Sequence, residues 1–359
     1  MASVDKRPNG KWRARWREYP GGPQKARHFA RKLDAVRHLV QVQHQLMAGT
    51  YVTPEAGRMT LGEFADVHLA RQPWRASTGV AAGKAFAHIR RTFGDRPLVS
   101  MRKGDVQAFV TGLDMRASTA ALVFQHLNSL LEAAAEDGLI ARNPARGVKL
   151  PALPAGEVVP PTTEQVEALY EAAVPWFRPA VVLGAGLGLR QAEACGLTAD
   201  RVLWLARSVR VDRQWNSRQR PAAFAPPKTR SSDRSVPAST FVLDRLAEHV
   251  GRRHEGFVLH RSGEPVDWQA FGHQWRQARK RAGLGTVRFH DLRHAFASML
   301  ISAGCSVKAV SRALGHSSAA TTLNLYSHLW PGDEDRIRDA VDLALGPRAE
   351  DRLRTVGEQ

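Results

Sequence analysis

The sequence predicts a multidomain, mainly α-helical protein: a small N-terminal β-sheet plus helix, a helical middle domain, and a mixed α+β C-terminal domain of helices with a small antiparallel sheet. Three observations support this fold class. Residues 11–17 alternate with the period of a β-strand, residues 59–150 carry helical periodicity, and β-like alternation returns briefly after about residue 201. A length of 359 residues, 43% of them apolar, allows two or three domains with separate cores.

The first domain is expected over residues 1–58, where basic residues strongly outnumber acidic ones. Trp12, Ala14 and Trp16 alternate with basic residues, so one face of this strand is apolar and the other is charged. A turn sequence, YPGGP, then leads to a partner strand in KARHFA. We expect the basic face to bind DNA; a merely solvated strand is the alternative. The DNA-binding candidates are Lys11, Arg13, Arg15 and Arg17.

A helix is predicted to follow the two strands and to brace the sheet. It runs from about Lys32 to Met47 and ends at Gly49, a residue type common after helix ends. We expect one apolar stripe of this helix to face the sheet. The stripe consists of Leu33, Val36, Leu39, Val40 and Leu46.

The second domain is expected over residues 59–150 and is predicted to be all helical. Thr60 and Glu63 have the spacing of a capping box and mark the start of its first helix. The strongest helical pattern is in STAALVFQHLNSLLEAAAEDGLI, whose leucines supply the apolar spacing. Prolines then become frequent, and residues 151–161 are predicted to be a linker between domains.

The third domain is expected over residues 162–345 and is followed by a tail at 346–359. Helices are predicted over 163–174 and 178–187, and Pro179 fits the first turn of the second. After a short sheet the domain is expected to be helical to its end. Acidic residues exceed basic ones near the C-terminus, which favours a docking or regulatory segment over a DNA contact.

Composition limits the function. With 52 basic and 34 acidic residues, the net charge of +18 and a pI near 10.8 point to a polyanion, most simply nucleic acid. The N-terminus lacks the apolar segment of a secretory signal, and the most apolar run is about half a membrane span. Cys195 and Cys305 form no metal-binding or disulfide pattern. We therefore expect a cytoplasmic, nucleoid-associated protein without a membrane partner.

Candidate site residues begin in FHDLRHAFASML. A helix here is expected to bury an apolar stripe of Leu292, Phe296, Met299, Leu300 and Ala303. His290 and Arg293 are three residues apart and are expected to share a polar face beside that stripe. Arginine supplies a planar fork for two phosphate oxygens and histidine adds a further donor, so this pair suits a phosphate site.

Two further candidates lie in LGHSSAATTLNLYSHL. The preceding helix is expected to stop at Gly315, so that His316 emerges from a tight turn. Tyr326 follows on a short helix, between Leu323 and Leu329 at three residues on either side. Those leucines are expected to anchor the helix while Tyr326 points elsewhere.

The last candidates lie upstream. Arg190 begins a short helix after a glycine-rich turn and has Glu193 on the same face; a weak surface ion pair is the alternative interpretation. Lys228 lies in KTRSSDRSVP, a polar hairpin or loop, where a lone lysine is usually only solvated. Two arginines, two histidines, a lysine and a tyrosine together suit attack on a phosphodiester without a metal.

These motifs resemble the tyrosine recombinase (phage integrase) family. The matching stretches are GLRQAE at 188–193, HDLRH at 290–294 and LGHSSAATTLNLYSH at 314–328, with KTRSSDRSVP as a weaker match. Their order and spacing agree over roughly 162–330. Residues 59–150 are similar to the family's core-binding domain, and residues 1–58 resemble the arm-binding domain of phage-type integrases by pattern alone.

The resemblance implies a role for each catalytic candidate. Tyr326 is the nucleophile that forms a 3′-phosphotyrosine, and Arg190 and Arg293 hold the phosphate oxygens. Lys228 is the general acid for the leaving 5′ oxygen. Because the bond energy is kept in the phosphotyrosine, no metal, ATP or other cofactor is expected.

The resemblance also implies supporting residues and partners. His290 assists proton transfer near the tyrosine, His316 holds the phosphate and positions the nucleophile, and Glu193 supports the arginine helix. The implied partner is double-stranded DNA at core-type and arm-type sites, bound by a homotetramer that integrates and excises a phage or integrative plasmid. An accessory DNA-bending protein and an excisionase are further implied partners.

Three alternatives stay open. A zinc hydrolase would use His290 and His294, which have helical metal-ligand spacing, but Asp291 replaces the glutamate of HExxH and no third ligand is evident. A non-catalytic helix-turn-helix protein would use the turn at Gly315. A dimer resolvase or topoisomerase would keep the chemistry but has less use for a basic N-terminal module. The sequence does not reveal the target DNA sites.

Overall fold

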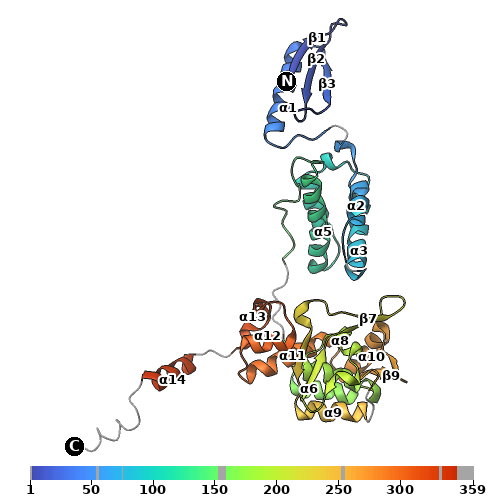
Figure 1. Cartoon of the computed structure of the whole chain (residues 1–359), viewed down its shortest axis with the longest axis vertical. Helices are drawn as coiled ribbons and strands as arrows, with labels where there is room; N and C mark the ends of the chain where they lie inside the picture. Colours follow the sequence, from blue (N-terminus) through green and yellow to red (C-terminus); the bar gives the residue numbers. More distant parts are fainter. Residues whose placement is uncertain are drawn as a thin grey trace, which may run out of the picture. The chain divides into compact units, whose positions relative to one another are not determined.

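We analysed a computed structural model of the chain (Figure 1), which describes residues 2–53, 56–74, 76–152, 159–251, 255–330 and 334–345. The chain divides into two compact units, Met1–Ala155 and Gly156–Gln359. It is mainly helical with small antiparallel sheets, so the predicted fold class is confirmed. The finer domain boundaries at 58, 150 and 161 remain predictions, and the predicted tail at 346–359 lies outside the described residues.

The first unit begins with a three-stranded antiparallel sheet in the order β1-β2-β3. Its strands are β1 (Ser3–Lys6), β2 (Trp12–Arg17) and β3 (Gln24–Phe29). Ala14 and Trp16 are buried, as the alternation of β2 predicts. The sequence pattern did not reveal β1, which pairs with β2 so that Asp5 lies opposite Arg13.

Helix α1 (Lys32–Met47) has the predicted bounds and packs on the sheet, but it buries a different face from the one predicted. Ala35 and Val42 are its buried residues. Leu33, Val36 and Val40 are 57%, 38% and 60% exposed, so the predicted core stripe is wrong for these three residues. Its other two members, Leu39 and Leu46, are half-buried.

Four helices form the rest of the first unit: α2 (Leu61–Ala70), α3 (Ala76–Phe93), α4 (Lys103–Thr111) and α5 (Ala117–Glu136). Thr60 and Glu63 form the expected capping box at the start of α2. Figure 1 shows α3 and α5 side by side, and their contact buries Phe86, Ile89 and Leu127 in one apolar core.

The second unit is built around α7 (Arg178–Leu187), which is buried along most of its length and packs against α6 (Thr163–Ala172), α9 (Thr240–Val250) and α11 (Phe289–Ser302). Its remaining helices are α8 (Gln191–Gly196), α10 (Trp268–Arg281), α12 (Val307–Leu314), α13 (Ala319–Tyr326) and α14 (Glu334–Leu345). Helices α7 and α11 pack against each other in one core, so the turn after α7 and the first turns of α11, which carry the two arginine motifs, lie in contact.

Short strands complete the second unit. They are β4 (Val202–Leu203), β5 (Ser208–Val211), β6 (Gln214–Asn216), β7 (Ala223–Ala225) and β8 (Arg234–Pro237), with a further pair, β9 (His260–Arg261) and β10 (Glu264–Pro265). Strands β4, β5 and β8 form one antiparallel sheet, and β6 pairs with β7. The β9–β10 pair corrects the expectation that the chain after β8 is helical throughout, because a positive-φ glycine at 263 turns the chain back on itself.

Candidate active site

The site is organised by two left-handed turns, the first of which joins α7 to α8. Gly188 ends α7 with φ of 62°. A Cβ at this position would lie 2.5 Å from Cδ1 of Phe296 on α11, so glycine is required both for the backbone angle and for the close approach. Arg190 follows as the N-cap of α8. The turn therefore places Arg190 at the surface of α11.

Arg190 is held by contacts at both ends of its guanidinium. Its Nη1 donates to Glu193 Oε1 at 2.8 Å and to Ser232 Oγ at 3.2 Å. Its Nη2 lies 3.4 Å from the carbonyl oxygen of Gly315. The side chain is 32% exposed, so the guanidinium is oriented by the protein and still open to a ligand.

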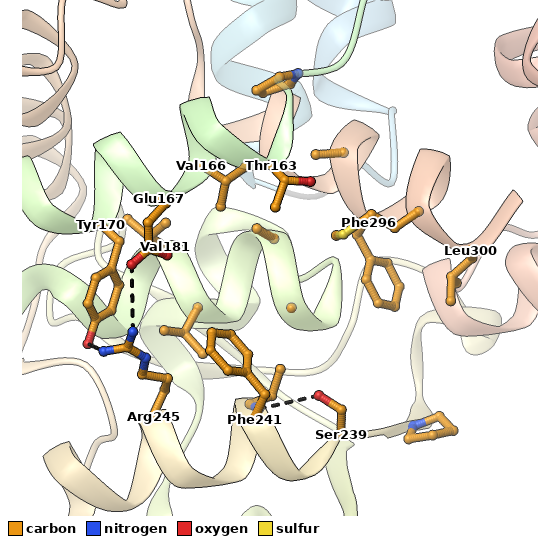
Figure 2. A pocket seen from close by; sticks show the side chains of 18 residues that line it. Thr163, Val166, Glu167, Tyr170, Val181, Ser239, Phe241, Arg245, Phe296 and Leu300 are labelled. Carbon is orange, nitrogen blue, oxygen red and sulfur yellow. Dashed lines mark hydrogen bonds and ion pairs between the residues drawn. The ribbon is translucent and has the colours of Figure 1, made fainter. Parts of the chain in front are cut away.

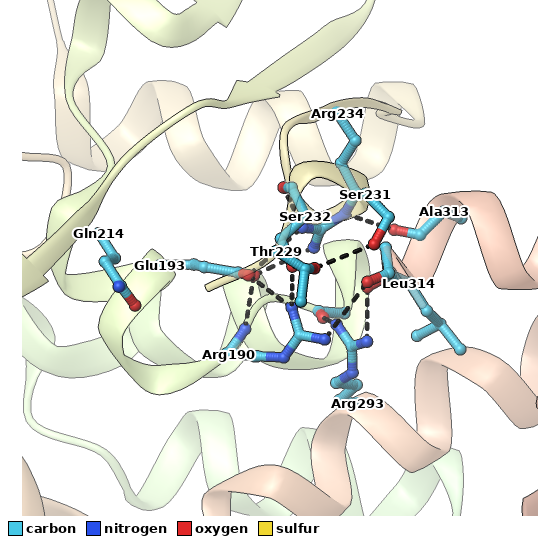
Figure 3. A network of polar contacts seen from close by, with 12 residues as sticks. Arg190, Glu193, Gln214, Thr229, Ser231, Ser232, Arg234, Arg293, Ala313 and Leu314 are labelled. Atoms are coloured by element: carbon cyan, nitrogen blue, oxygen red, sulfur yellow. Dashed lines mark hydrogen bonds and ion pairs between the residues drawn. The ribbon is translucent and has the colours of Figure 1, made fainter. Parts of the chain in front are cut away.

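Glu193 is buried between two arginines, which overturns the weak-surface-pair alternative (Figure 3). Besides Arg190, it accepts from Arg234 Nη2 at 3.1 Å, and both partners in this pair are 4% exposed. Burial raises the pKa of Glu193, but the charge and hydrogen bonds of Arg234, followed by those of Arg190, outweigh burial and lower it below the usual value. The carboxylate is therefore ionised and holds both guanidiniums.

Arg234 was missed as a site residue by sequence reasoning. Its Nε donates to the carbonyl of Ala313 at 2.7 Å, near the end of α12, while its Nη1 donates to the Ser232 carbonyl at 3.0 Å. A signal was present: Arg234 alternates with Ser235 on β8 and shares the buried face with Val236. An arginine on the apolar face of a strand requires a buried partner, and Glu193 provides it.

Arg293 is also buried, contrary to the expectation that it shares an open polar face with His290. It is 1% exposed, and α11 buries every residue from Leu292 to Ala297. Its Nη1 donates to the Gly188 carbonyl at 2.7 Å, and its Nη2 donates to the Leu314 carbonyl. Burial and the nearby Arg190 charge lower its pKa, although a guanidinium stays protonated at neutral pH.

The predicted apolar stripe of α11 is correct for Leu292 and Phe296 but wrong at its C-terminal end. Met299 is 44% exposed and Ala303 is exposed. The helix is enclosed near its N-terminus by α7 and α12 and opens to solvent further along. His290, in the first turn, is exposed, yet partial burial of its ring and then the charges of His294 and Arg293 lower its pKa to about 4.

The second left-handed turn presents His316. Gly315 ends α12 with φ of 67°, as predicted, and a Cβ there would lie 3.0 Å from Arg234 Cδ and from the Ser231 carbonyl oxygen. His316 Nδ1 is 2.8 Å from the hydroxyl of Thr322, which is fully buried in α13. Burial and then the charges of the nearby arginines lower the pKa of His316 to about 4, so the ring is neutral at physiological pH.

Tyr326 is one of two buried residues of α13, with Thr322, whereas the sequence predicts that the flanking leucines anchor the helix; Leu329 does pack against the core, but Leu323 does not. Tyr326 is 1% exposed and Leu323 is 42% exposed. The hydroxyl is 2.6 Å from Nδ1 of His294, a residue for which we predicted no catalytic role. Burial raises the pKa of Tyr326 to about 12, and the phenol is therefore protonated.

The structure brings most of the predicted catalytic residues together. Arg190 and Arg293 contact the consecutive carbonyls of Gly315 and Leu314, directly before His316. Lys228 does not contact the other catalytic candidates. It is exposed in the loop between β7 and β8 and forms no hydrogen bond or ion pair within the described residues.

The basic face of the N-terminal sheet is partly occupied by an acidic residue. Arg13 Nη2 is 2.9 Å from Asp5 Oδ2, and Arg15 Nε is 3.2 Å from Asp5 Oδ1. Lys11 is exposed, and Arg17 is exposed with its guanidinium donating to the Gly22 carbonyl. Arg13, Arg15 and Arg17 thus lie on β2 and Lys11 directly precedes it, and two of these four residues are paired with a carboxylate.

A separate apolar pocket of about 390 Å³ lies between α6, α7, α9 and α11 (Figure 2). Arg245 is its main polar feature and binds Tyr170 Oη at 3.2 Å and Glu167 Oε1 at 3.6 Å. The predicted catalytic residues do not line it. Its apolar lining is unsuited to an anionic phosphate, so it is distinct from the site described above.

The described residues contain neither a metal site nor a helix that could span a membrane. Among the described residues there is no group of three or more His, Cys, Asp or Glu side chains arranged to hold a metal. The helices in the described part of the chain are too short or too polar to cross a bilayer. The site is a basic cluster of two arginines and a histidine beside a buried tyrosine, an arrangement whose chemistry suits a phosphodiester.

Comparison with known proteins identifies the family. Residues 162–331 match the model of the phage integrase family. The chain is 31% identical over 227 residues to tyrosine recombinase XerD of Corynebacterium glutamicum, covering 60% of this chain and 71% of that protein. A XerC-like recombinase of Caldanaerobacter subterraneus is 28% identical over 244 residues, which span 61% of its length. The chain belongs to the tyrosine recombinase (phage integrase) family of site-specific DNA recombinases.

Other matches extend over nearly the whole chain. A putative prophage phiRv2 integrase of Mycobacterium tuberculosis is 25% identical over 349 residues, covering 92% of each protein. The Tn1549 transposon integrase, solved with circular intermediate DNA, superposes with a TM-score of 0.69 at 21% identity, covering 79% of this chain and 99% of that one. A lambda integrase dimer bound to a core site gives a TM-score of 0.56 at 20% identity, covering 92% and 96%. The two structures establish a shared fold.

Proposed function

We propose that this protein is the integrase of a mobile genetic element, which cleaves and rejoins DNA through a 3′-phosphotyrosine at Tyr326. The observation that carries the proposal is the convergence of Arg190 and Arg293 on the turn before His316, together with the hydrogen bond of Tyr326 to His294, which neighbours Arg293 on α11. A phosphodiester needs its non-bridging oxygens neutralised before a phenol can attack it, and two oriented guanidiniums provide this.

Arg190 and Arg293 differ in exposure, which suggests different roles for the two arginines. Arg190 is partly exposed and directed by Glu193, so it binds the scissile phosphate directly. Arg293 is buried and donates hydrogen bonds to the carbonyls of Gly188 and Leu314. It therefore holds the turn before His316 in place and adds positive potential from the protein interior. His316, neutral and oriented by Thr322, donates a hydrogen bond to a phosphate oxygen.

Lys228 is proposed as the general acid for the leaving 5′ oxygen. Its position on an exposed loop, without an intramolecular partner in the described residues, leaves the ammonium free to enter the site when DNA binds. Beside His290, a shallow pocket of about 450 Å³ is lined by Arg276, Arg279 and Arg288, which suit the neighbouring backbone phosphates.

The extent of similarity favours an integrase over a chromosome-dimer resolvase. The prophage integrase aligns over 92% of this chain and 92% of its own length, whereas XerD aligns over 60% of this chain. We infer that Lys11, Arg13, Arg15 and Arg17 contact arm-type DNA. A homotetramer on DNA, an accessory bending protein, an excisionase, and a nucleoid-associated location in the cytoplasm belong to the same proposal; a lambda integrase tetramer has been solved on a Holliday junction.

The central test uses a nicked suicide substrate carrying the core site. We expect a denaturation-resistant protein–DNA adduct that forms in the presence of a chelator and is absent in Tyr326→Phe. Tyr170→Phe is the matched control, because Tyr170 is also buried and hydrogen-bonded but lines the separate apolar pocket. An adduct in Tyr326→Phe would show that another residue is the nucleophile.

Deleting residues 1–58 separates the integrase from the resolvase. A resolvase needs only its core site, so recombination would continue without the N-terminal domain. For an integrase that bridges two kinds of site, we expect core-site cleavage to persist and recombination to be lost. Unchanged recombination by the truncated chain would favour the resolvase.

A further inference from the structure

The hydroxyl of Tyr326 is bonded to a second histidine of α11, not to the histidine implied by the family resemblance. Nδ1 of His294 is 2.6 Å from Tyr326 Oη. Within the described residues, it is the one hydrogen bond found for this hydroxyl. His294 is 5% exposed and Tyr326 is 1% exposed. Both rings are fixed by packing, because His294 lies among buried residues of α11 and Tyr326 closes the end of α13.

The charge states of the two groups and the tautomer of His294 set the direction of this hydrogen bond. Burial raises the pKa of Tyr326 to about 12, so the phenol keeps its proton. Burial also lowers the pKa of His294 below its usual value, so the imidazole is neutral. In the tautomer that carries its proton on Nε2, Nδ1 presents a lone pair and the bond runs from the phenol O–H to Nδ1, the geometry in which a base removes a proton.

His290 is less suited to this role. Its ring centroid is 5.0 Å from that of His294, nearly perpendicular to it, and the residue is exposed on the open side of the helix. The hydrogen bonds of the described residues include none between His290 and Tyr326. His290 is instead placed toward the arginine-lined pocket, where Gln191 and Arg288 also lie.

We propose that His294 is the general base that accepts the proton of Tyr326 during DNA cleavage. This rests on the proposed role of Tyr326 as nucleophile. As the phenolic oxygen forms its bond to phosphorus, the O–H proton passes to Nδ1 of His294. The bond from phosphorus to the 5′ oxygen breaks, and its electron pair leaves with that oxygen, which takes a proton from Lys228. In rejoining, His294 returns the proton to Tyr326.

The surroundings of His294 suit a transient positive charge. On its own helix it faces the carboxylate of Asp291, which favours the imidazolium, and the guanidiniums of Arg288 and Arg293 and the ring of His290, which oppose it. From α13 it faces Tyr326 itself. Burial, and after it the opposing cations, keep the base neutral before reaction, while Asp291 stabilises the charge that forms during attack.

Two substitutions separate a base from a structural support. His294→Asn places an amide oxygen near the position of Nδ1, so it preserves the hydrogen bond to Tyr326 but cannot take the proton. His294→Ala opens a space into which added imidazole can enter. His290→Asn is the matched control, one helical turn earlier on the same face of α11. Core-site DNA binding by each variant checks that the protein is folded.

The measurement is the single-turnover rate of covalent adduct formation on the suicide substrate between pH 5.5 and 9.5. The wild-type rate should fall at the acidic end as His294 becomes protonated. His294→Asn should be slower at pH 7 by about 10²–10³-fold, the usual loss of a general base, and should speed up steadily toward high pH as hydroxide replaces it. Added imidazole should restore part of the His294→Ala rate.

The outcomes distinguish this proposal from the one it rests on. If His294→Asn reacts within threefold of wild type at every pH, His294 is not the base. If His290→Asn shows the pH-dependent loss and His294→Asn does not, His290 has the role. If Tyr326→Phe forms the adduct, the nucleophile assignment itself fails. If His294→Ala does not bind DNA, the imidazole measurement is dropped. The rate of His294→Asn and its pH profile then decide whether His294 is the base.

Discussion

Glu193 and Arg234 form a buried ion pair, with 3.1 Å between Oε2 and Nη2, and each side chain is only 4% exposed. Through its other contacts this pair joins two distant segments: Glu193 orients Arg190, and Arg234 binds the carbonyl of Ala313 two residues before Gly315. The pair therefore fixes the distance between the arginine helix and the turn that presents His316.

Removing one partner of this pair should be costly. We expect Glu193→Gln or Arg234→Met to lower the free energy of unfolding of the second unit by about 3–5 kcal/mol, because each leaves a buried group without its counter-charge. The double variant Glu193→Leu/Arg234→Met should recover part of that stability but not adduct formation, since Arg190 loses its support. Urea titration of the full chain measures the stability; a loss under 1 kcal/mol for Glu193→Gln would contradict this.

The lowered pKa of the Glu193 carboxylate predicts that the free energy of unfolding depends on pH. The folded-state pKa of Glu193 is lowered from its usual 4.5, so the group contributes stability above that pH and loses it as pH falls through the folded value. Stability should decline below about pH 4.5 in the wild type, with a smaller slope in Glu193→Gln. Equal slopes in urea titrations between pH 5 and 3 would show that Glu193 is not responsible.

Thr322 is expected to matter through His316. Thr322→Val preserves the shape of the side chain but removes the hydroxyl 2.8 Å from Nδ1, so the ring loses its orientation. We expect adduct formation to slow by about tenfold, which corresponds to about 1.4 kcal/mol, the scale of one hydrogen bond. Thr322→Ser is the control and should stay close to wild type. Similar rates for the Val and Ser variants would exclude the orienting role.

Alanine should destabilise the protein more at Gly188 than at Gly283, another glycine with a left-handed backbone conformation. In Gly188→Ala the strain at φ of 62° adds to a 2.5 Å approach to Phe296, for a total loss of about 2–5 kcal/mol. Gly283→Ala has φ of 70° but open space around its Cβ, so it should lose only about 1–2 kcal/mol. Thermal unfolding of both variants gives the comparison, and equal losses would mean that Phe296 moves aside.

Asp5 competes with DNA phosphate for Arg13 and Arg15. Asp5→Asn frees two guanidiniums on the sheet, so we expect binding of arm-type DNA to strengthen by about two- to tenfold and to depend more steeply on salt. Asp34→Asn makes the same charge change on an exposed position of α1 and is the control. Titrations in a Tyr326→Phe background measure binding alone; an equal gain in both variants would indicate a net-charge effect only.

Local patterns predicted much of the fold. The bounds of α1, the capping box of α2 and the Gly315 turn follow from residues close in sequence, whose backbone preferences are expressed wherever the segment is placed. Strand β1 escaped prediction because SVDK is short and has no apolar alternation; its pairing with β2 holds it in place. Which stripe of α1 is buried also depended on its partner, because both of its faces carry apolar residues.

The sequence by itself determined which residues are candidates for phosphate chemistry and in what order they occur: Arg190, His290, Arg293, His316 and Tyr326 follow from the motifs and their spacing. The tertiary structure decided how they are held. It buried Arg293 and Tyr326, paired Glu193 with Arg234 and placed His294 against the tyrosine hydroxyl. The contact of His294 with Tyr326 joins residues 32 apart in the sequence, and that of Glu193 with Arg234 joins residues 41 apart. The burial and charge states of these residues depend on how whole helices and strands pack, which local periodicity does not encode.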